Sequence, residues 1–116
     1  MLRVLLVDDE PDIRLVLRTA LRLRSGIEIV GEATTSFSAA ELATEQAPDL
    51  VVLDLGLPDS SGSDSYVQVQ AAAPGSKFVI YSSSDAEREW FRTHGVDFVG
   101  KNGDLTELMD VVGKSA

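Results

Sequence analysis

Residues 50–53 form an entirely apolar run that ends at Asp54, and the Leu-Gly-Leu-Pro that follows cannot continue a strand. Such a short apolar run, bounded by turn residues, is typical of a strand buried on both faces of a parallel sheet. Ligands and chemistry collect at the carboxyl edge of sheets of this kind. Asp54 is therefore predicted to stand at the functional edge of an α/β fold.

A second apolar run, residues 4–7, ends in the same way at Asp8 and Asp9. If the two strands are neighbours, three carboxylates meet at one rim. Two carboxylates about 4 Å apart repel each other by about 4 kcal/mol at an effective dielectric constant near 20. This grouping of acids therefore predicts a bound cation.

Strand and helix patterns alternate along the whole chain. The strands are expected at residues 4–7, 27–30, 50–53, 77–82 and 97–100. The first helix is expected from Pro11 to near Ser25 and Gly26, with a core face of Ile13, Val16, Leu17, Ala20 and Leu21. The other helices are expected from Ser38 to before Pro48, over 63–73, over 85–94 and from Asp104; Ser38 with Glu41 and Asp104 with Glu107 are capping patterns. Five such repeats predict a doubly wound parallel sheet with helices on both faces, in one domain of residues 1–116.

Composition limits the classes of function. The chain has 116 residues, 44% of them hydrophobic, which is enough for one core. It has no cysteine, which excludes thiolate chemistry and fits a reducing cytoplasm. The first apolar run is too short for a signal peptide or a membrane span. The net charge of -9 opposes direct contact with nucleic acid or an anionic membrane.

Two more predicted strands end in functional groups, namely Ser82 and Lys101. With these groups, with Val-Asp-Asp at 7–9 and with Asp-Leu-Gly-Leu-Pro at 54–58, the chain resembles the receiver domain of bacterial response regulators over essentially its whole length. The resemblance implies a flavodoxin-like sheet with strand order 2-1-3-4-5. The segment at 26–33 resembles the corresponding segment of receivers that precede a helix-turn-helix DNA-binding domain.

The resemblance also implies a role for each of these groups. Asp54 would be the phosphoacceptor for a sensor histidine kinase, and Mg²⁺ the cofactor. The ligands of the metal would be Asp9, Asp54 and the Gly56 carbonyl, supported by Asp8. Lys101 would bind the phosphoryl group, with Ser82 as the switch hydroxyl and Phe98 as the aromatic that turns inward with it; Gly56 and Ser84 stand where the family tunes dephosphorylation. Such a domain catalyses only its own phosphorylation and dephosphorylation, and the resemblance is compatible with a homodimer.

The chain departs from the family pattern near Lys101. Asn102 follows this lysine where the family usually has proline, so a less rigid loop is expected. The interval from Ser82 to Lys101 is a few residues shorter than usual, which should shorten the fourth helix by about a turn. Ser83 replaces the usual alanine, so the choice of switch hydroxyl among residues 82–84 stays open.

Three other classes of protein compete with this interpretation. A flavodoxin-type cofactor binder needs a Ser- and Thr-rich phosphate loop after the first strand, and Asp8 and Asp9 would repel that phosphate. A haloacid-dehalogenase-type phosphatase has a second Asp two residues after the first, where this chain has Gly56. A receiver-like interaction module that takes no phosphate is the third alternative. The presence of all five strand-end groups argues against it.

Overall fold

The computed structural model of residues 1–116 contains one five-stranded sheet in which the order is β2-β1-β3-β4-β5. All neighbouring strands are parallel. The strands are β1 (Leu2–Val7), β2 (Ile27–Ala33), β3 (Leu50–Leu53), β4 (Lys77–Ser82) and β5 (Asp97–Gly100). The predicted sheet and its strand order are confirmed, and β3, β4 and β5 have the predicted ends.

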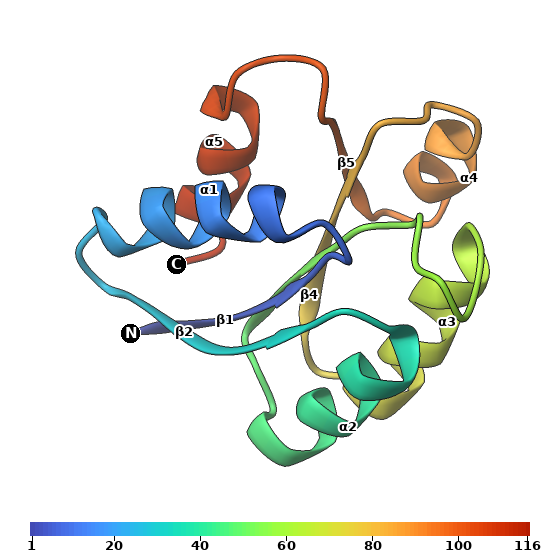
Figure 1. Cartoon of the computed structure of the whole chain (residues 1–116), viewed down its shortest axis with the longest axis horizontal. Coiled ribbons are helices and arrows are strands. Elements are labelled where there is room, and N and C mark those ends of the chain that lie inside the picture. Colours follow the sequence, from blue (N-terminus) through green and yellow to red (C-terminus); the bar gives the residue numbers. More distant parts are fainter.

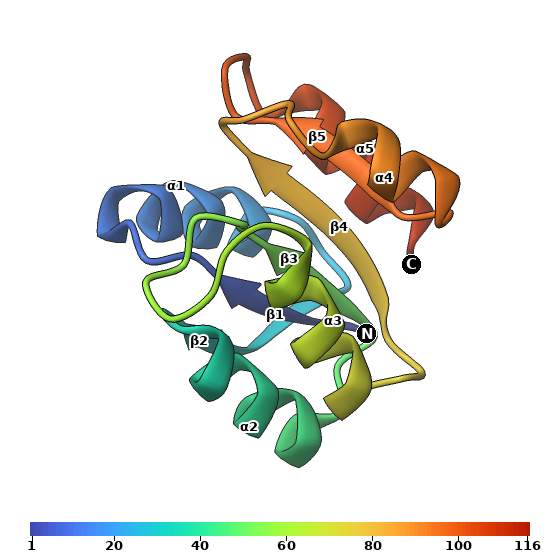
Figure 2. The same cartoon turned by 90° about the vertical axis from the view of Figure 1, so that its right-hand side faces the viewer.

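Helices cover both faces of this sheet (Figures 1 and 2). They are α1 (Pro11–Arg22), α2 (Ser36–Gln46), α3 (Ser63–Ala72), α4 (Arg88–Thr93) and α5 (Thr106–Lys114). Helices α1 and α5 pack on one face and α2, α3 and α4 on the other, which produces two buried apolar clusters. None of the helices has the length and apolar character needed to cross a membrane.

The all-apolar strand β3 serves both clusters, because successive side chains of a strand point to opposite faces. Val51 and Leu53 belong to the cluster under α2, α3 and α4. Leu50 and Val52 belong to the cluster under α1 and α5. The absence of a polar position in this run therefore follows from its central place in the sheet.

Strand β2 runs three residues past its predicted end at Val30. The register shifts between Val4 and Leu5 of β1, which pair with Ile29 and Gly31, so Val30 forms a bulge. Gly31 continues the strand in a crowded position, where an added Cβ would lie 3.3 Å from both Leu5 and Leu42. Glycine at this position therefore reflects close packing against α2 and not the end of the strand.

The ends of α1 and α2 differ from those predicted. Helix α1 ends at Arg22, before the predicted Ser25 and Gly26, and Val16 is exposed instead of facing the core. The capping box of α2 is formed by Thr35 and Ser38, not by Ser38 and Glu41. Thr35 has an extended backbone, and its side chain accepts the Ser38 N–H at 3.0 Å.

Helices α4 and α5 also begin later than predicted. Helix α4 has only six residues and starts at Arg88 instead of Asp85. Helix α5 starts at Thr106, and Asp104 accepts the Thr106 N–H at 3.0 Å from outside the helix. Helix α4 is the shortest of the five helices, and Glu87, the residue before it, lies near Asp54 and Ser82 at the carboxyl edge of the sheet.

Candidate functional site

Four neighbouring strands bring the predicted site residues to one edge of the sheet. The backbone bonding of the sheet continues into these residues, since the Asp54 N–H donates to the Val7 carbonyl at 2.9 Å. The Lys101 N–H donates to the Ser82 carbonyl at 2.8 Å in the same way. The positions of the functional groups are therefore set by strand pairing and not by free loops.

Lys101 is the centre of the site. Its Nζ lies 2.8 Å from Asp8 Oδ2, 3.3 Å from Asp54 Oδ1 and 3.5 Å from Glu10 Oε1. Its side chain is only 7% exposed. Burial alone lowers the pKa of the Lys101 ammonium, but its bonds to Asp8 and Asp54 outweigh burial and raise the pKa. Lys101 is therefore a positive charge held between two buried carboxylates.

The negative charge of ionised Asp54 is only partly offset by its surroundings. Burial raises the pKa of the Asp54 carboxyl above its usual value, Lys101 opposes this effect, and the charge of Asp8 adds to it. A hydrogen bond from the Gly56 backbone also acts to lower the pKa. The ionised carboxylate thus exists at a free-energy penalty, which a second cation would relieve.

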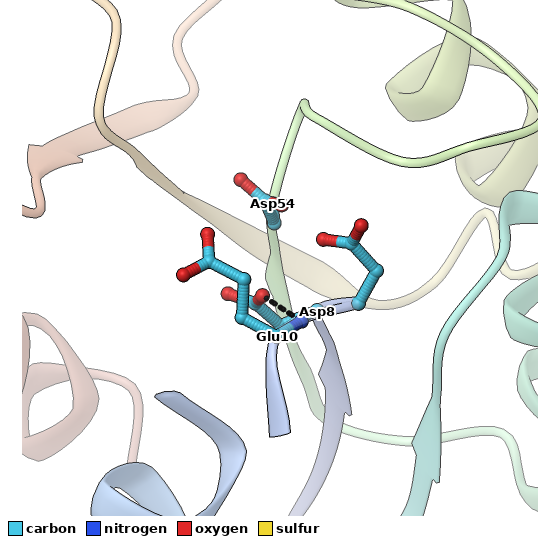
Figure 3. Close-up of side chains that lie close together, drawn as sticks. Asp8, Glu10 and Asp54 are labelled. Carbon is cyan, nitrogen blue, oxygen red and sulfur yellow. Dashed lines mark hydrogen bonds between the residues drawn. The ribbon is translucent and has the colours of Figure 1, made fainter. Parts of the chain in front are cut away.

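The acids gather as the sequence predicted. Carboxylate oxygens of Asp8, Asp9, Glu10 and Asp54 lie within 4.8 Å of one another. Figure 3 shows Asp8, Glu10 and Asp54 converging beyond β1 and β3, with the Glu10 N–H donating to Asp8 Oδ1 at 2.9 Å. These are hard oxygen donors, and Mg²⁺ typically takes one or two carboxylates and retains waters. The donor set therefore fits that ion.

The three consecutive serines differ in burial. Ser82 is 4% exposed, and its Oγ accepts the Ser84 N–H at 3.2 Å. Ser83 and Ser84 are exposed. All three border a hollow of about 200 Å³ above Asp54, which Gly56 also lines. Ser82 is the one serine whose position is fixed by the sheet itself.

Phe98 lies on β5, away from this hollow. Its ring is 6.0 Å from that of Phe91, and the Arg88 guanidinium lies 4.6 Å over its face. Trp90 is partly buried and packs edge-on to Phe91, with the two ring centres 4.9 Å apart. Phe98 thus belongs to an aromatic cluster beneath α4.

With this geometry, comparison with known proteins identifies the family. The family model of the response regulator receiver domain matches residues 4–113. The chain belongs to this family. Its members are signalling domains and not enzymes in the usual sense.

Relatives of the receiver domain include the response regulator protein VraR from two staphylococci. The VraR of Staphylococcus saprophyticus is 31% identical over 117 residues, which cover 98% of this chain and 56% of the relative. That of Staphylococcus aureus is 30% identical over 118 residues, which cover 99% of this chain and 56% of the relative. The receiver domain thus spans about half the length of these relatives.

Solved structures of the same fold come from Thermotoga maritima. The response regulator domain of CheB has a TM-score of 0.86 and 25% identity, covering 99% of this chain and 96% of that chain. TrrA has a TM-score of 0.86 and 28% identity, and the match covers both chains completely. TrrA was crystallised in complex with Mg²⁺ and beryllium fluoride.

Two acids of the receiver domain site were not predicted from sequence. Glu10 follows Asp8 and Asp9 directly and could be read as a first-turn acid of α1, yet it borders the hollow above Asp54. Glu87 borders the same hollow from the start of α4. Because Glu10 is adjacent to Asp9, the sequence could have indicated that it lies at the site. No sequence pattern indicates this for Glu87, because its position depends on the length of the loop at 83–87.

Proposed function

We propose that Asp54 of this receiver domain accepts a phosphoryl group from a sensor histidine kinase in the presence of Mg²⁺. The observation that carries the proposal is the arrangement around Lys101, whose ammonium bridges Asp8 and Asp54 beneath an open hollow. In this proposal, residues 1–116 form a single receiver domain. The Mg²⁺ complex of TrrA and the fit of the acid cluster to that ion support it.

The proposed transfer forms one covalent bond and breaks one. An Asp54 oxygen attacks the phosphorus of the phosphohistidine, and a P–O bond forms as the P–N bond breaks. The electron pair leaves with the imidazole, which departs neutral because its other nitrogen carries a proton. Phosphoryl transfer depends mainly on positioning and electrostatics, and Lys101 supplies a fixed positive charge for a phosphoryl oxygen.

The other side chains bind the metal ion or respond to the phosphorylation of Asp54. Asp9, Asp54 and the Gly56 carbonyl would hold Mg²⁺, with Asp8 in support, and the ion supplies positive charge for the phosphoryl oxygens. Ser82 donates a hydrogen bond to the attached phosphoryl group, and Phe98 moves with it. This new bond is the differential contact that shifts the domain to an active conformation. The domain would also catalyse its own dephosphorylation, and Gly56 and Ser84, which are small and uncharged, neither block an attacking water nor assist it.

A non-phosphorylated interaction module is the second candidate, because α4 has only six residues and Asn102 follows Lys101 where the family usually has proline. Treatment with acetyl phosphate separates the two. We expect acid-labile phosphate on Asp54 with Mg²⁺, none with EDTA, and none in Asp54→Asn. A protein without acid-labile phosphate, whose Trp90 fluorescence does not respond to Mg²⁺ and beryllofluoride, would contradict the acceptor role.

Two further variants test the assigned roles. We expect Asp9→Asn and Lys101→Ala to lose phosphorylation while circular dichroism shows a folded domain. Asp110→Asn, at an exposed acid of α5, is the matched control and should be phosphorylated normally. Normal labelling of either site variant would refute the corresponding role.

A further inference from the structure

The first turn of α3 is capped by Glu87, the residue that precedes α4. Gly62 occupies the N-cap position of α3 and has no side chain to offer. The Glu87 carboxylate accepts the Ser63 N–H at 2.8 Å through Oε2. A carboxylate at this place also interacts favourably with the positive end of the helix dipole. The residue that precedes α4 thus completes the amino end of α3.

The fit between Glu87 and Gly62 is close. Gly62 has φ of +55°, and a Cβ added there would lie 1.8 Å from Glu87 Oε1. One carboxylate oxygen is therefore hydrogen-bonded to α3 while the other lies against the bare Cα of Gly62. We call this contact between Glu87 and residues 62–63 the clasp.

The clasp closes one side of the hollow above Asp54. Both Gly62 and Glu87 line that hollow, together with Asp54 and Ser82. Only residues 83–86 separate Ser82 from Glu87, the acid of the clasp. The Ser82 hydroxyl meanwhile accepts the Ser84 N–H at 3.2 Å, a bond within its own loop. A movement that turns Ser82 toward Asp54 therefore acts on a loop that Glu87 anchors at its other end.

We propose that Glu87 is a positioning residue for the switch, and that the clasp holds the loop at 83–87 in the placement of the unmodified domain. The inference rests on the proposed phosphorylation of Asp54. A phosphoryl group adds negative charge to the hollow that the Glu87 carboxylate lines, and like charges repel. Modification thus weakens the clasp, and by linkage the clasp weakens the binding of a phosphoryl group or its mimic.

The test measures the affinity for beryllofluoride with saturating Mg²⁺ by ¹⁹F NMR. We expect Glu87→Ala to bind at least about fivefold more tightly than the wild type, the lower end of common coupling factors. Glu87→Gln keeps an acceptor for the Ser63 N–H but loses the charge, so an intermediate affinity is expected. Glu89→Ala is the control, because Glu89 pairs with Arg92 on the exposed side of α4. A merely structural role for Glu87 would weaken binding, not tighten it.

Gly62→Ala probes the clasp from the other side. Its Cβ displaces the carboxylate in the wild type, whereas in Glu87→Ala there is no carboxylate to displace. We therefore expect the two substitutions to be non-additive in beryllofluoride affinity. Equal affinity of wild type and Glu87→Ala, or additive effects, would overturn the clasp while leaving the acceptor role intact. A wild type that binds no beryllofluoride would instead overturn the acceptor role, and the clasp with it.

Discussion

Lys101 lies closer to Asp8 than to Asp54, with its Nζ 2.8 Å from an Asp8 oxygen and 3.3 Å from an Asp54 oxygen. Asp8 also accepts the Glu10 N–H, so both of its oxygens are engaged. Asp8 thus anchors the ammonium, and Asp54 shares it. This asymmetry fits a site in which Asp54 changes chemically while Lys101 stays in place.

Removal of the ammonium should destabilise the domain in metal-free buffer. Lys101→Met leaves the buried Asp8 and Asp54 carboxylates without their cation, and breaking a buried pair typically costs about 3 kcal/mol or more. We expect Mg²⁺ to restore more stability to this variant than to the wild type, since the ion replaces the lost charge. Urea unfolding with EDTA or MgCl₂ measures both effects. Lys77→Met, at an exposed lysine, is the control, and an equal response in both variants would contradict the pairing.

Neutralising Asp54 should have the opposite effect. Burial and the charge of Asp8 penalise the ionised Asp54 carboxylate, and Lys101 relieves this only in part. We therefore expect Asp54→Asn to raise the urea midpoint in EDTA at neutral pH, and to lose the stabilisation that Mg²⁺ confers on the wild type. A lower midpoint in EDTA would show that the ionised carboxylate contributes more to the fold than its burial costs.

Asp59 should make stability depend on acid pH. Its carboxylate accepts the Ser36 N–H at 2.8 Å and the Phe37 N–H at 3.0 Å at the start of α2. These bonds hold the pKa of Asp59 below its ordinary value of 3.8. A lowered folded-state pKa stabilises the fold above the ordinary value, and this contribution is lost as pH falls through the lowered one.

The wild type should therefore exceed Asp59→Asn in urea midpoint at pH 7, and the difference should shrink as the pH falls below the ordinary pKa of 3.8. A titration of the midpoint against pH measures this. Asp12→Asn is the control, because Asp12 is an exposed acid in the first turn of α1. A difference that persists unchanged at low pH would exclude ionisation of Asp59 as its source.

Arg88 should stabilise Phe98 in its place on β5. The guanidinium lies 4.6 Å over the ring and pairs with Asp85 at 2.8 Å. A double-mutant cycle of Arg88→Ala and Phe98→Leu in urea unfolding should yield a coupling of about 0.5 to 1 kcal/mol. Arg92→Ala is the matched control, since Arg92 forms a similar pair with Glu89 on the same helix. Coupling of equal size between Arg92 and Phe98 would argue against a specific contact.

The strands were the most predictable part of the fold. Residues such as Val51 and Val79 lie in apolar runs that only a central strand can bury, so the pattern indicates both the element and its place. Helix ends were less predictable. Ser38 and Glu41 fit the usual Ser/Thr-x-x-Glu/Gln capping pattern, yet Thr35 and Ser38 form the cap of α2, because Thr35 is the residue with the extended backbone that precedes the helix.

The residues of the site also differ in how well the sequence predicts them. Asp8, Asp54, Ser82 and Lys101 were predictable because parallel strands present their carboxyl ends at one edge. Glu87 and Asp59 were not, since both act on helices other than the ones that follow them in sequence. Such contacts depend on how loops cross in space, and no local pattern encodes them.

Gly62 and Glu87 also constrain how this chain can diverge. A side chain at position 62 would overlap the Glu87 carboxylate and would also have to adopt a φ of +55°, so relatives with a residue other than glycine there should be rare. Loss or shortening of the acid removes this overlap but leaves the positive φ of Gly62, so replacing the glycine stays costly even after the acid is gone. Among close relatives we therefore expect some proteins that have Gly62 without Glu87, and very few that have Glu87 without Gly62.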